Sequence, residues 1–336
     1  MNKIDNIKIT VVGFGSWGTA LAVLLAKKGY DVTVTARNID HLAEVEFLRV
    51  NNKYLPQVKI PDNVKFDSNL LEAVSGANII LFAVPSQHFG NTLKKAVVNI
   101  NKDAIIVNVA KGIDKKSLKR LSDIAKEILP EIRYVALSGP SHAEEVGRNM
   151  PAGVVAASDD MEAAEIIQSV FMTERFRVYT HDDVIGVELG GALKNIMAIG
   201  AGISDGLGYG DSAKAALMTR GIAEISRLGT SLGAKRETFA GLSGIGDLIV
   251  TCTSGHSRNR RCGLLIGQGM SPKEASDSIG MVVEGISTCE AAYKLSVTTG
   301  VDMPITSIIH ACLNEEIRAK DAIDLLMNRS PKDERK

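Results

Sequence analysis

A glycine-rich stretch near the N-terminus constrains the fold of this chain more than any other feature. Residues 11–20 read VVGFGSWGTA, in which Gly13, Gly15 and Gly18 form a G-x-G-x-x-G pattern. An apolar run comes directly before this pattern and a run with helical periodicity directly after it. In that context the three glycines allow a tight turn, the approach of a phosphate to bare backbone, and close packing of helix on strand. The stretch therefore predicts a strand, a turn and a helix N-terminus that hold a dinucleotide pyrophosphate.

The first half of the chain alternates strand-like runs with helical patterns. Runs such as IILFAV and AIIVNVA are apolar throughout, as expected of parallel strands covered on both faces. Repeated units of this kind predict a Rossmann-type α/β fold with a doubly wound parallel sheet. The expected strands are Ile7–Val12, Asp31–Thr35, Asn78–Val84, Ala104–Val109, Arg133–Leu137 and Gly153–Ala157. The expected helices are Trp17–Lys28, Ile39–Val50, Ser86–Asn99 and Ser117–Leu129, and Tyr54–Asn63, with its two prolines, is expected to be a loop.

The second half has a different character. From Asp182 onward the sequence is mostly helical in period and contains few strand-like runs. A chain of 336 residues also suggests two domains, at roughly 150 residues per domain. We therefore expect a dinucleotide-binding domain over residues 1–180 and an all-α substrate and catalytic domain over 181–336.

Composition argues against several classes of function. The 39 basic and 39 acidic residues cancel, so the overall charge does not point to nucleic acid or to a membrane surface. The four cysteines form no C-x-x-C pair and have no metal-ligand spacing, which favours reduced thiols and no metal. The N-terminus lacks the apolar core of a signal peptide, and no apolar run approaches the roughly 18 residues of a membrane span. We expect a cytoplasmic protein without membrane insertion.

The end of the second expected strand bears on the choice of dinucleotide. In this fold an acidic residue at that point binds the ribose hydroxyls of NAD. Here the strand is followed by Ala36, Arg37 and Asn38, with no carboxylate. Arg37 suits a 2′-phosphate, although a solvated surface arginine is the alternative. The pattern favours NADPH/NADP as the cofactor, and NADH/NAD stays possible.

One lysine in the second half lies in an apolar helical pattern. In VELGGALKNIMAIGAG, the polar stripe of a helical wheel holds only Lys194 and Asn195, together with Gly191 and Ala198. The small residues suggest that another group approaches this face closely. Burial lowers the pKa of a lysine and can prepare it for proton transfer. The alternative is an exposed lysine that faces a hinge, and we favour the functional interpretation.

A second polar cluster lies in GLSGIGDLIVTCTSGHSRNRRCG. Asp247 follows a glycine-rich turn, and Ser257, Arg258 and Asn259 stand at an expected helix start. A hydroxyl, an arginine and an asparagine at a helix N-terminus form a site for a phosphate or a carboxylate. The alternative is a solvated basic face on which Ser257 is an ordinary N-cap.

Two loops follow expected strands at their C-terminal ends, where ligands bind in such sheets. One contains Lys111, and the other spans residues 138–143, SGPSHA. Both are placed to reach a substrate between the domains. His142 is an acid/base candidate there, but a lone loop histidine is more often solvated or structural, so we leave it out of the site.

These motifs, taken in order, resemble the bacterial NAD(P)-dependent sn-glycerol-3-phosphate dehydrogenase family. The resemblance runs from Lys8 to about Leu326 and is far more specific than the glycine pattern alone. The motifs that carry it are GFGSWGTALA, NVAKGI, LSGPSHAEEV, ELGGALKNIMAIGAGISDGL, GLSGIGDLIVTCTSGHSRNRRCG and VVEGI.

The resemblance implies roles for the residues at matching positions. Lys194 is implied to be the catalytic proton donor and acceptor. The implied substrate contacts are Lys111, Gly139, Ser141, Lys194, Asp247, Ser257, Arg258 and Asn259. With the glycine pattern included, the expected cofactor contacts are Gly13, Gly15, Ser16, Trp17, Gly18, Arg37, Lys111, Ala143, Arg258, Val282 and Glu284.

The implied reaction is reversible hydride transfer between the nicotinamide and C2 of dihydroxyacetone phosphate. Its product, sn-glycerol 3-phosphate, supplies phospholipid synthesis, and the resemblance also implies a homodimer. One rival is another β-hydroxyacid-type dehydrogenase that acts on a carboxylate substrate. The other rival is a nucleotide sensor without chemistry, against which the apolar setting of Lys194 argues.

Overall fold

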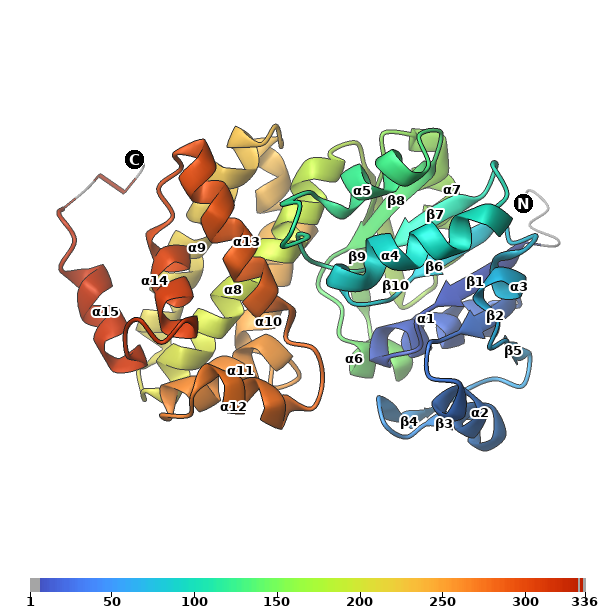
Figure 1. The fold of residues 1–336 in the computed structure, drawn as a ribbon, viewed down its shortest axis with the longest axis horizontal. Helices are drawn as coiled ribbons and strands as arrows, with labels where there is room; N and C mark the ends of the chain where they lie inside the picture. The colour runs from blue at the N-terminus through green and yellow to red at the C-terminus, as the bar shows by residue number, and fades with distance from the viewer. Residues whose placement is uncertain (1–6, 332, 335–336) are drawn as a thin grey trace.

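A computed structural model of the chain describes residues 7–331 and 333–334, which form a sheet-centred half and a helical half side by side (Figure 1). The change of architecture falls between strand β10 (Phe176–His181) and helix α8 (Val184–Gly206). We refer to the elements before this point as the sheet half and to those after it as the helical half.

The sheet half is built on an eight-stranded sheet in the order β10-β9-β8-β7-β6-β1-β2-β5. All neighbouring strands are parallel except β8 and β9. The expected Rossmann-type α/β fold is therefore confirmed. The remaining strands are β1 (Lys8–Val12), β2 (Asp31–Thr35), β5 (Val64–Phe66), β6 (Ile79–Phe82), β7 (Ile105–Asn108), β8 (Arg133–Ser138) and β9 (Ala152–Ala157).

Helices on both faces explain why the central strands are apolar throughout. On β6, Ile79 and Leu81 join the core beneath α1 and α7, while Ile80 and Phe82 join the core beneath α4 and α5. Alternate side chains of one strand thus enter two different cores, as expected of a doubly covered parallel sheet. The helices of this half are α1 (Ser16–Lys27), α2 (Ile39–Leu48), α3 (Leu70–Val74), α4 (Ser86–Ala96), α5 (Leu121–Ile128), α6 (Ala143–Gly147) and α7 (Met161–Phe171).

The sheet departs from the expected parallel arrangement at one edge. The strand expected at Gly153–Ala157 is present as β9, but it runs antiparallel to β8. The segment between β8 and β9 contains only the five-residue helix α6 and turns back at the same edge of the sheet, whereas a parallel pair requires a crossover. β10, which was not expected, runs parallel to β9 and extends this edge.

The prediction of a loop over Tyr54–Asn63 is wrong in part. Strand β4 (Leu55–Lys59) lies within it and pairs antiparallel with β3 (Val50–Asn51). Leu55 and Val58 are buried and hold this ribbon against the sheet half. A proline is tolerated in β4 because the strand belongs to a two-stranded ribbon, where one edge is unpaired.

The helix expected over Ser117–Leu129 begins only at Leu121. Asp114 accepts hydrogen bonds from the backbone N–H and the hydroxyl of Ser117, 2.8 Å each, and closes a turn there. A short polar side chain that bonds nearby backbone in this way competes with helix formation.

The helical half is organised around α8. Its helices α9, α10, α11, α13 and α14 all pack against α8. By length and composition α8 could cross a membrane, but 89% of its most apolar 18-residue stretch is buried inside the protein. Such burial is typical of the core helix of a compact domain. The other helices are α9 (Asp211–Ser231), α10 (Asp247–Thr253), α11 (Arg258–Gly267), α12 (Pro272–Ile279), α13 (Glu284–Thr299), α14 (Pro304–Leu313) and α15 (Ala319–Met327).

Glycines on both partners let α8 and α11 approach very closely. A Cβ atom on Gly202 would lie 2.0 Å from the carbonyl oxygen of Arg260, and one on Gly263 would lie 2.0 Å from that of Ile199. No side chain fits between backbones at this separation. The contact brings the start of α11 alongside the middle of α8, where Lys194 lies.

Gly263→Ala is expected to destabilise the protein, because the added methyl group must displace the backbone of α8. Overpacking of this kind costs about 1–3 kcal/mol, which exceeds the roughly 1 kcal/mol gained by replacing glycine within a helix. Thermal or denaturant unfolding measures the change. The control is Gly255→Ala, where a Cβ atom meets nothing within 4 Å. Equal stability of the two variants would contradict the close contact.

Candidate active site

The glycine turn has the shape that a pyrophosphate requires. Gly13 has a φ of +101°, and a Cβ atom there would lie 2.7 Å from the carbonyl oxygen of Ala83. A Cβ atom on Gly18 would lie 2.1 Å from the carbonyl oxygen of Gly13, whereas one on Gly15 meets nothing within 4 Å. The outer glycines are thus packed and the middle one faces open space. Since α1 begins directly after Gly15, its free N–H groups can hold a phosphate there.

The other residues expected to contact the cofactor lie at several places around this turn. Ser16 and Trp17 open α1, and the Trp17 ring packs against Phe176 with ring centroids 6.5 Å apart. Arg37 is exposed just beyond the end of β2. Ala143 opens α6, which packs against α1. These positions suit a dinucleotide that extends from the start of α1 towards β2.

Three charged residues from distant parts of the chain meet at the boundary between the halves. The Lys111 Nζ atom lies 2.6 Å from Asp247 Oδ2 and 3.0 Å from the carbonyl oxygen of Gly139. The Lys194 Nζ atom donates to Asp247 Oδ1, and also to Thr251 Oγ1 at 2.6 Å. One carboxylate therefore bridges a lysine of the sheet half and a lysine of the helical half.

Burial of Lys194 changes its acidity. Only 6% of the residue is exposed. Desolvation lowers its pKa to about 8, assisted by the nearby positive charge of Lys111 and opposed by the attraction of Asp247. A lysine in this range can both give and take a proton near neutral pH.

Gly191 explains why small residues surround Lys194. A Cβ atom on Gly191 would lie 2.6 Å from Ser138 Oγ and 3.5 Å from the side chain of Lys111. The group that approaches this face of α8 is therefore the C-terminal edge of the sheet. Ligands of doubly wound sheets bind at the same edge.

The residues of the predicted anion site lie at the start of α11. The Ser257 hydroxyl, which is buried, accepts from the backbone N–H of Arg260 at 3.2 Å and caps the helix. Arg258 is half-buried and donates to the carbonyl oxygen of Val282 at 3.0 Å. The first N–H groups of a helix lack acceptors within the helix, so this end suits a phosphate.

Asn259 differs from the other residues of this cluster in what its side chain already binds. Its Nδ2 atom donates to Asn195 Oδ1, and its Oδ1 atom accepts from the backbone N–H of Gly285, both at 2.9 Å. The side chain thus joins α8, α11 and α13. Its second amide hydrogen and its backbone N–H are the groups left for a ligand.

Glu284, at the start of α13, crosses the boundary between the halves. Its carboxylate accepts from the backbone N–H of Ser86 at 3.0 Å and from the Ser86 hydroxyl at 2.5 Å, at the start of α4. Val282 lies nearby and is 46% exposed. The structure thus places Glu284 beside the sheet half, and the carbonyl oxygen of Val282 accepts from Arg258. Sequence reasoning without the resemblance did not find them, because the segment contains no recognisable binding pattern.

The loop after β8 contributes backbone and polar groups to the same region. The carbonyl oxygen of Gly139 accepts from both Lys111 and the Ser141 hydroxyl, the latter at 3.1 Å. His142, which we had left out, has a buried Nε2 atom with no hydrogen-bond partner in the described part of the chain. Its ring centroid lies 5.8 Å from that of His256, and burial and Lys194 lower its pKa. This histidine belongs to the surroundings of the site.

Thr251 is a contact of Lys194 that the sequence analysis does not include among the site residues. It lies four residues after Asp247 on α10, so both side chains share one helix face and meet Lys194. That spacing was the available signal. Among the described residues no three His, Cys, Asp or Glu side chains are grouped as for a metal ion.

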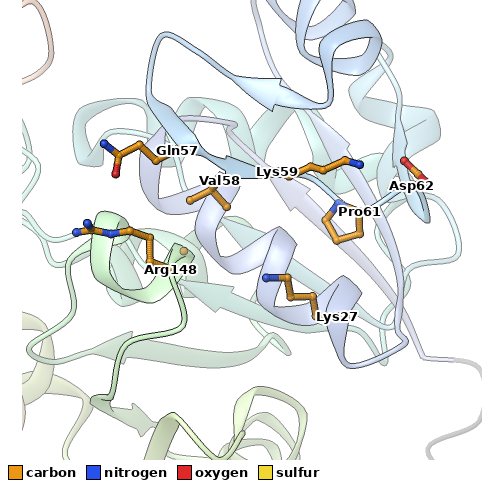
Figure 2. A pocket seen from close by; sticks show the side chains of 8 residues that line it. Lys27, Gln57, Val58, Lys59, Pro61, Asp62 and Arg148 are labelled. Atoms are coloured by element: carbon orange, nitrogen blue, oxygen red, sulfur yellow. The ribbon is translucent and has the colours of Figure 1, made fainter.

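A separate pocket of about 350 Å³ lies between α1, β4 and the end of α6 (Figure 2). Figure 2 shows Lys27, Lys59 and Arg148 around it. Its lining residues are Lys27, Gln57, Val58, Lys59, Pro61, Asp62, Gly147 and Arg148. None of the predicted site residues lines this pocket, so it does not belong to the site described above.

A glycine cradle on a Rossmann-type sheet, together with a buried lysine on a helical domain, is typical of dehydrogenases that use a nicotinamide dinucleotide. Comparison with known families agrees with this class. The chain belongs to the NAD-dependent glycerol-3-phosphate dehydrogenase family, whose N-terminal model matches residues 8–164 and whose C-terminal model matches residues 183–324.

Similar proteins cover almost the whole chain. The glycerol-3-phosphate dehydrogenase [NAD(P)+] of Clostridium perfringens is 50% identical over 327 residues, which are 97% of this chain and 99% of that protein. The Clostridium tetani protein of the same name is 52% identical over 97% of this chain and 93% of its own length. The crystal structure of glycerol-3-phosphate dehydrogenase from Coxiella burnetii has a TM-score of 0.94 at 39% identity, covering 96% of this chain and 99% of that one.

Arg37→Ala is expected to raise the KM for NADPH and to leave the KM for NADH close to that of the wild type. A charge-assisted hydrogen bond to the 2′-phosphate contributes roughly 1.5–3 kcal/mol, so the increase is about tenfold or more. Initial rates with each cofactor measure it. The control is Arg175→Ala, an exposed arginine next to β10 at the opposite edge of the sheet. A parallel change for both cofactors would contradict a contact with the 2′-phosphate.

Proposed function

We propose that the chain reduces dihydroxyacetone phosphate reversibly to sn-glycerol 3-phosphate, with NADPH or NADH as the cofactor and Lys194 as the proton donor. The observation that carries the proposal is the buried Lys194 ammonium, bound to Asp247 and Thr251 where the two halves meet. Membership of the glycerol-3-phosphate dehydrogenase family supports the substrate and the reaction. The product serves glycerophospholipid synthesis.

The proton transfer follows from the position of Lys194. A nicotinamide dinucleotide held at the glycine turn of Gly13, Gly15 and Gly18 would supply the hydride that C2 requires. Lys194 donates a proton to the oxygen on C2 and becomes the neutral amine, which regains a proton from solvent before the next turnover. Lys111 stabilises the negative charge that develops on this oxygen, and Asp247 keeps both lysines in place. Oxidation of the alcohol uses the same groups in reverse.

The substrate phosphate is assigned to the start of α11. Ser257, Arg258 and the free N–H groups of the helix supply donors, with Gly139 and Ser141 completing the site from the sheet half. Binding energy from this phosphate, remote from C2, fixes the orientation of the reacting carbon. A carboxylate substrate fits the same donors, which is the basis of the rival β-hydroxyacid chemistry.

The substrate test compares NADPH oxidation with dihydroxyacetone phosphate against oxidation with ketoacids of similar size. We expect turnover with the phosphate ester alone.

Lys194→Met is expected to lower kcat by a factor on the order of 10² to 10⁴ while the dissociation constant of NADPH stays unchanged. The control is Lys294→Met, which removes an exposed lysine of α13. Turnover of a ketoacid, or none of any substrate, would support one of the two rivals instead.

The pH dependence of the two directions is expected to be opposite. Reduction needs the ammonium form of Lys194, whose pKa is about 8, so kcat/KM is flat below pH 8 and falls about tenfold per pH unit above it. Oxidation needs the free amine, so its kcat/KM rises with pH and levels off above 8. Initial rates from pH 6 to 10 measure both limbs. Identical limbs in the two directions would argue against Lys194 as the group that transfers the proton.

Three further properties belong to this proposal. We divide the chain into a dinucleotide-binding domain over residues 1–180 and a helical substrate and catalytic domain over 181–336. We place the protein in the cytoplasm as a homodimer, which the family resemblance supports. Light scattering on the purified protein measures its mass, and a monomer mass would refute the dimer.

A further inference from the structure

One face of α8 docks the helical half onto the sheet half. Glu188, Gly191 and Asn195 are spaced three and four residues apart, so they share this face. Gly191 lies against Ser138 and Lys111, and Asn195 Nδ2 donates to the carbonyl oxygen of Lys111 at 3.5 Å. Glu188, at the beginning of the same face, makes the most extensive polar contact.

Within the described part of the chain, every hydrogen bond that the Glu188 carboxylate accepts comes from the sheet half. The backbone N–H and the hydroxyl of Ser122 donate at 3.0 and 2.5 Å, and the Tyr134 hydroxyl donates at 2.7 Å. The Arg120 guanidinium lies at 3.4 Å. The Glu188 side chain is only 7% exposed. Burial raises the pKa of Glu188, while Arg120 and the hydrogen bonds from Ser122 and Tyr134 favour its ionised form. The carboxylate caps the start of α5 across the boundary.

The Glu188 contact lies close to Lys194 on the same rigid helix, α8. Glu188 precedes Lys194 by six residues on α8, or about 9 Å along the helix axis. The segment between them is buried on nearly all sides, so it cannot bend freely. Lys111, which meets the same Asp247 carboxylate as Lys194, belongs to the sheet half. The separation of the two lysines therefore depends on how α8 is docked.

We propose that Glu188 is a positioning residue for the reaction: by capping α5 across the boundary it sets α8 so that Lys194 and Lys111 meet one carboxylate. The inference rests on the proposed role of Lys194 as proton donor. Glu188 itself touches neither substrate nor cofactor in this scheme. Its effect on the rate passes entirely through the placement of α8.

A second buried glutamate provides a matched control within one half. Glu224 is 1% exposed, and its carboxylate accepts from the backbone N–H groups of Ile305 and Thr306 at 2.7 and 3.2 Å. It therefore caps the start of α14 as Glu188 caps α5. The difference is that α9 and α14 both belong to the helical half, so Glu224 ties no elements across the boundary.

The experiment compares Glu188→Gln with Glu224→Gln in the full-length protein. Glu188→Gln is expected to lower kcat about 10- to 100-fold with an unchanged dissociation constant for NADPH, because small misplacement of a catalytic group has this effect. In Glu188→Gln, the pH above which kcat/KM for reduction falls should rise from its wild-type value of about 8. The reason is that Lys194 becomes more hydrated and lies farther from Lys111, and both changes raise its pKa. Glu224→Gln is expected to lower the melting temperature while kcat and the pH limb stay at wild-type values.

Wild-type kcat and an unmoved limb in Glu188→Gln, or equal losses in the two variants, would overturn the positioning role alone. Wild-type kcat in Lys194→Met would overturn it together with the proposed proton donor. Should Glu188→Gln not fold, Ser122→Ala removes one hydroxyl donor and keeps the backbone N–H. That variant is expected to move kcat and the limb in the same directions by a smaller factor, and wild-type values for both would equally refute the inference.

Discussion

The ion pair on which this structure depends is the Asp247 carboxylate shared by Lys111 and Lys194. Charges are expensive to bury unless they are paired, and here two positive charges surround one negative charge. The cluster therefore keeps a net positive charge in a buried environment with little water, where electrostatic interactions are strong. This charge is already in position to stabilise an oxyanion that forms beside the lysines. The free energy spent on burying Lys111, Lys194 and Asp247 is thereby offset when the substrate reacts.

Glycines make this arrangement possible by letting α8 approach three neighbours at once. Gly190 lies against the backbone of Ser243, Gly191 against Ser138, and Gly202 against the backbone of α11. Each glycine lowers the intrinsic helix propensity of α8 by about 1 kcal/mol, and only tertiary packing can offset that loss. The helix is therefore stable as the core of this fold, and Lys194 is buried because its neighbours come so close.

Features that depend on a local sequence pattern could be predicted better than features that depend on the path of the chain or on the direction of a strand. The glycine turn and the doubly covered strands follow from spacing and apolar runs, and the structure contains both. The direction of β9 depends on how the segment after β8 returns, and the β3–β4 ribbon lies where prolines suggested a loop. Within the site, Lys194 and Asp247 were each singled out, but a pairing across 53 residues has no local signal. Residue type also did not reveal that the Asn259 side chain is already bound to Asn195 and Gly285.

The helix starts of the sheet half fall into three groups, according to the side chain that caps them. Asn38, Asn69 and Asp160 cap α2, α3 and α7 from within the same half, while Glu284 and Glu188 reach α4 and α5 from the helical half. Within the described residues, the N-caps of α1 and α6 make no side-chain hydrogen bond. A carboxylate at a helix start occupies the place that a phosphate would take. The caps therefore close α4 and α5 to anions and leave the starts of α1 and α6 open. Of these two, the start of α1 lies beside Gly15, where we propose that the pyrophosphate binds.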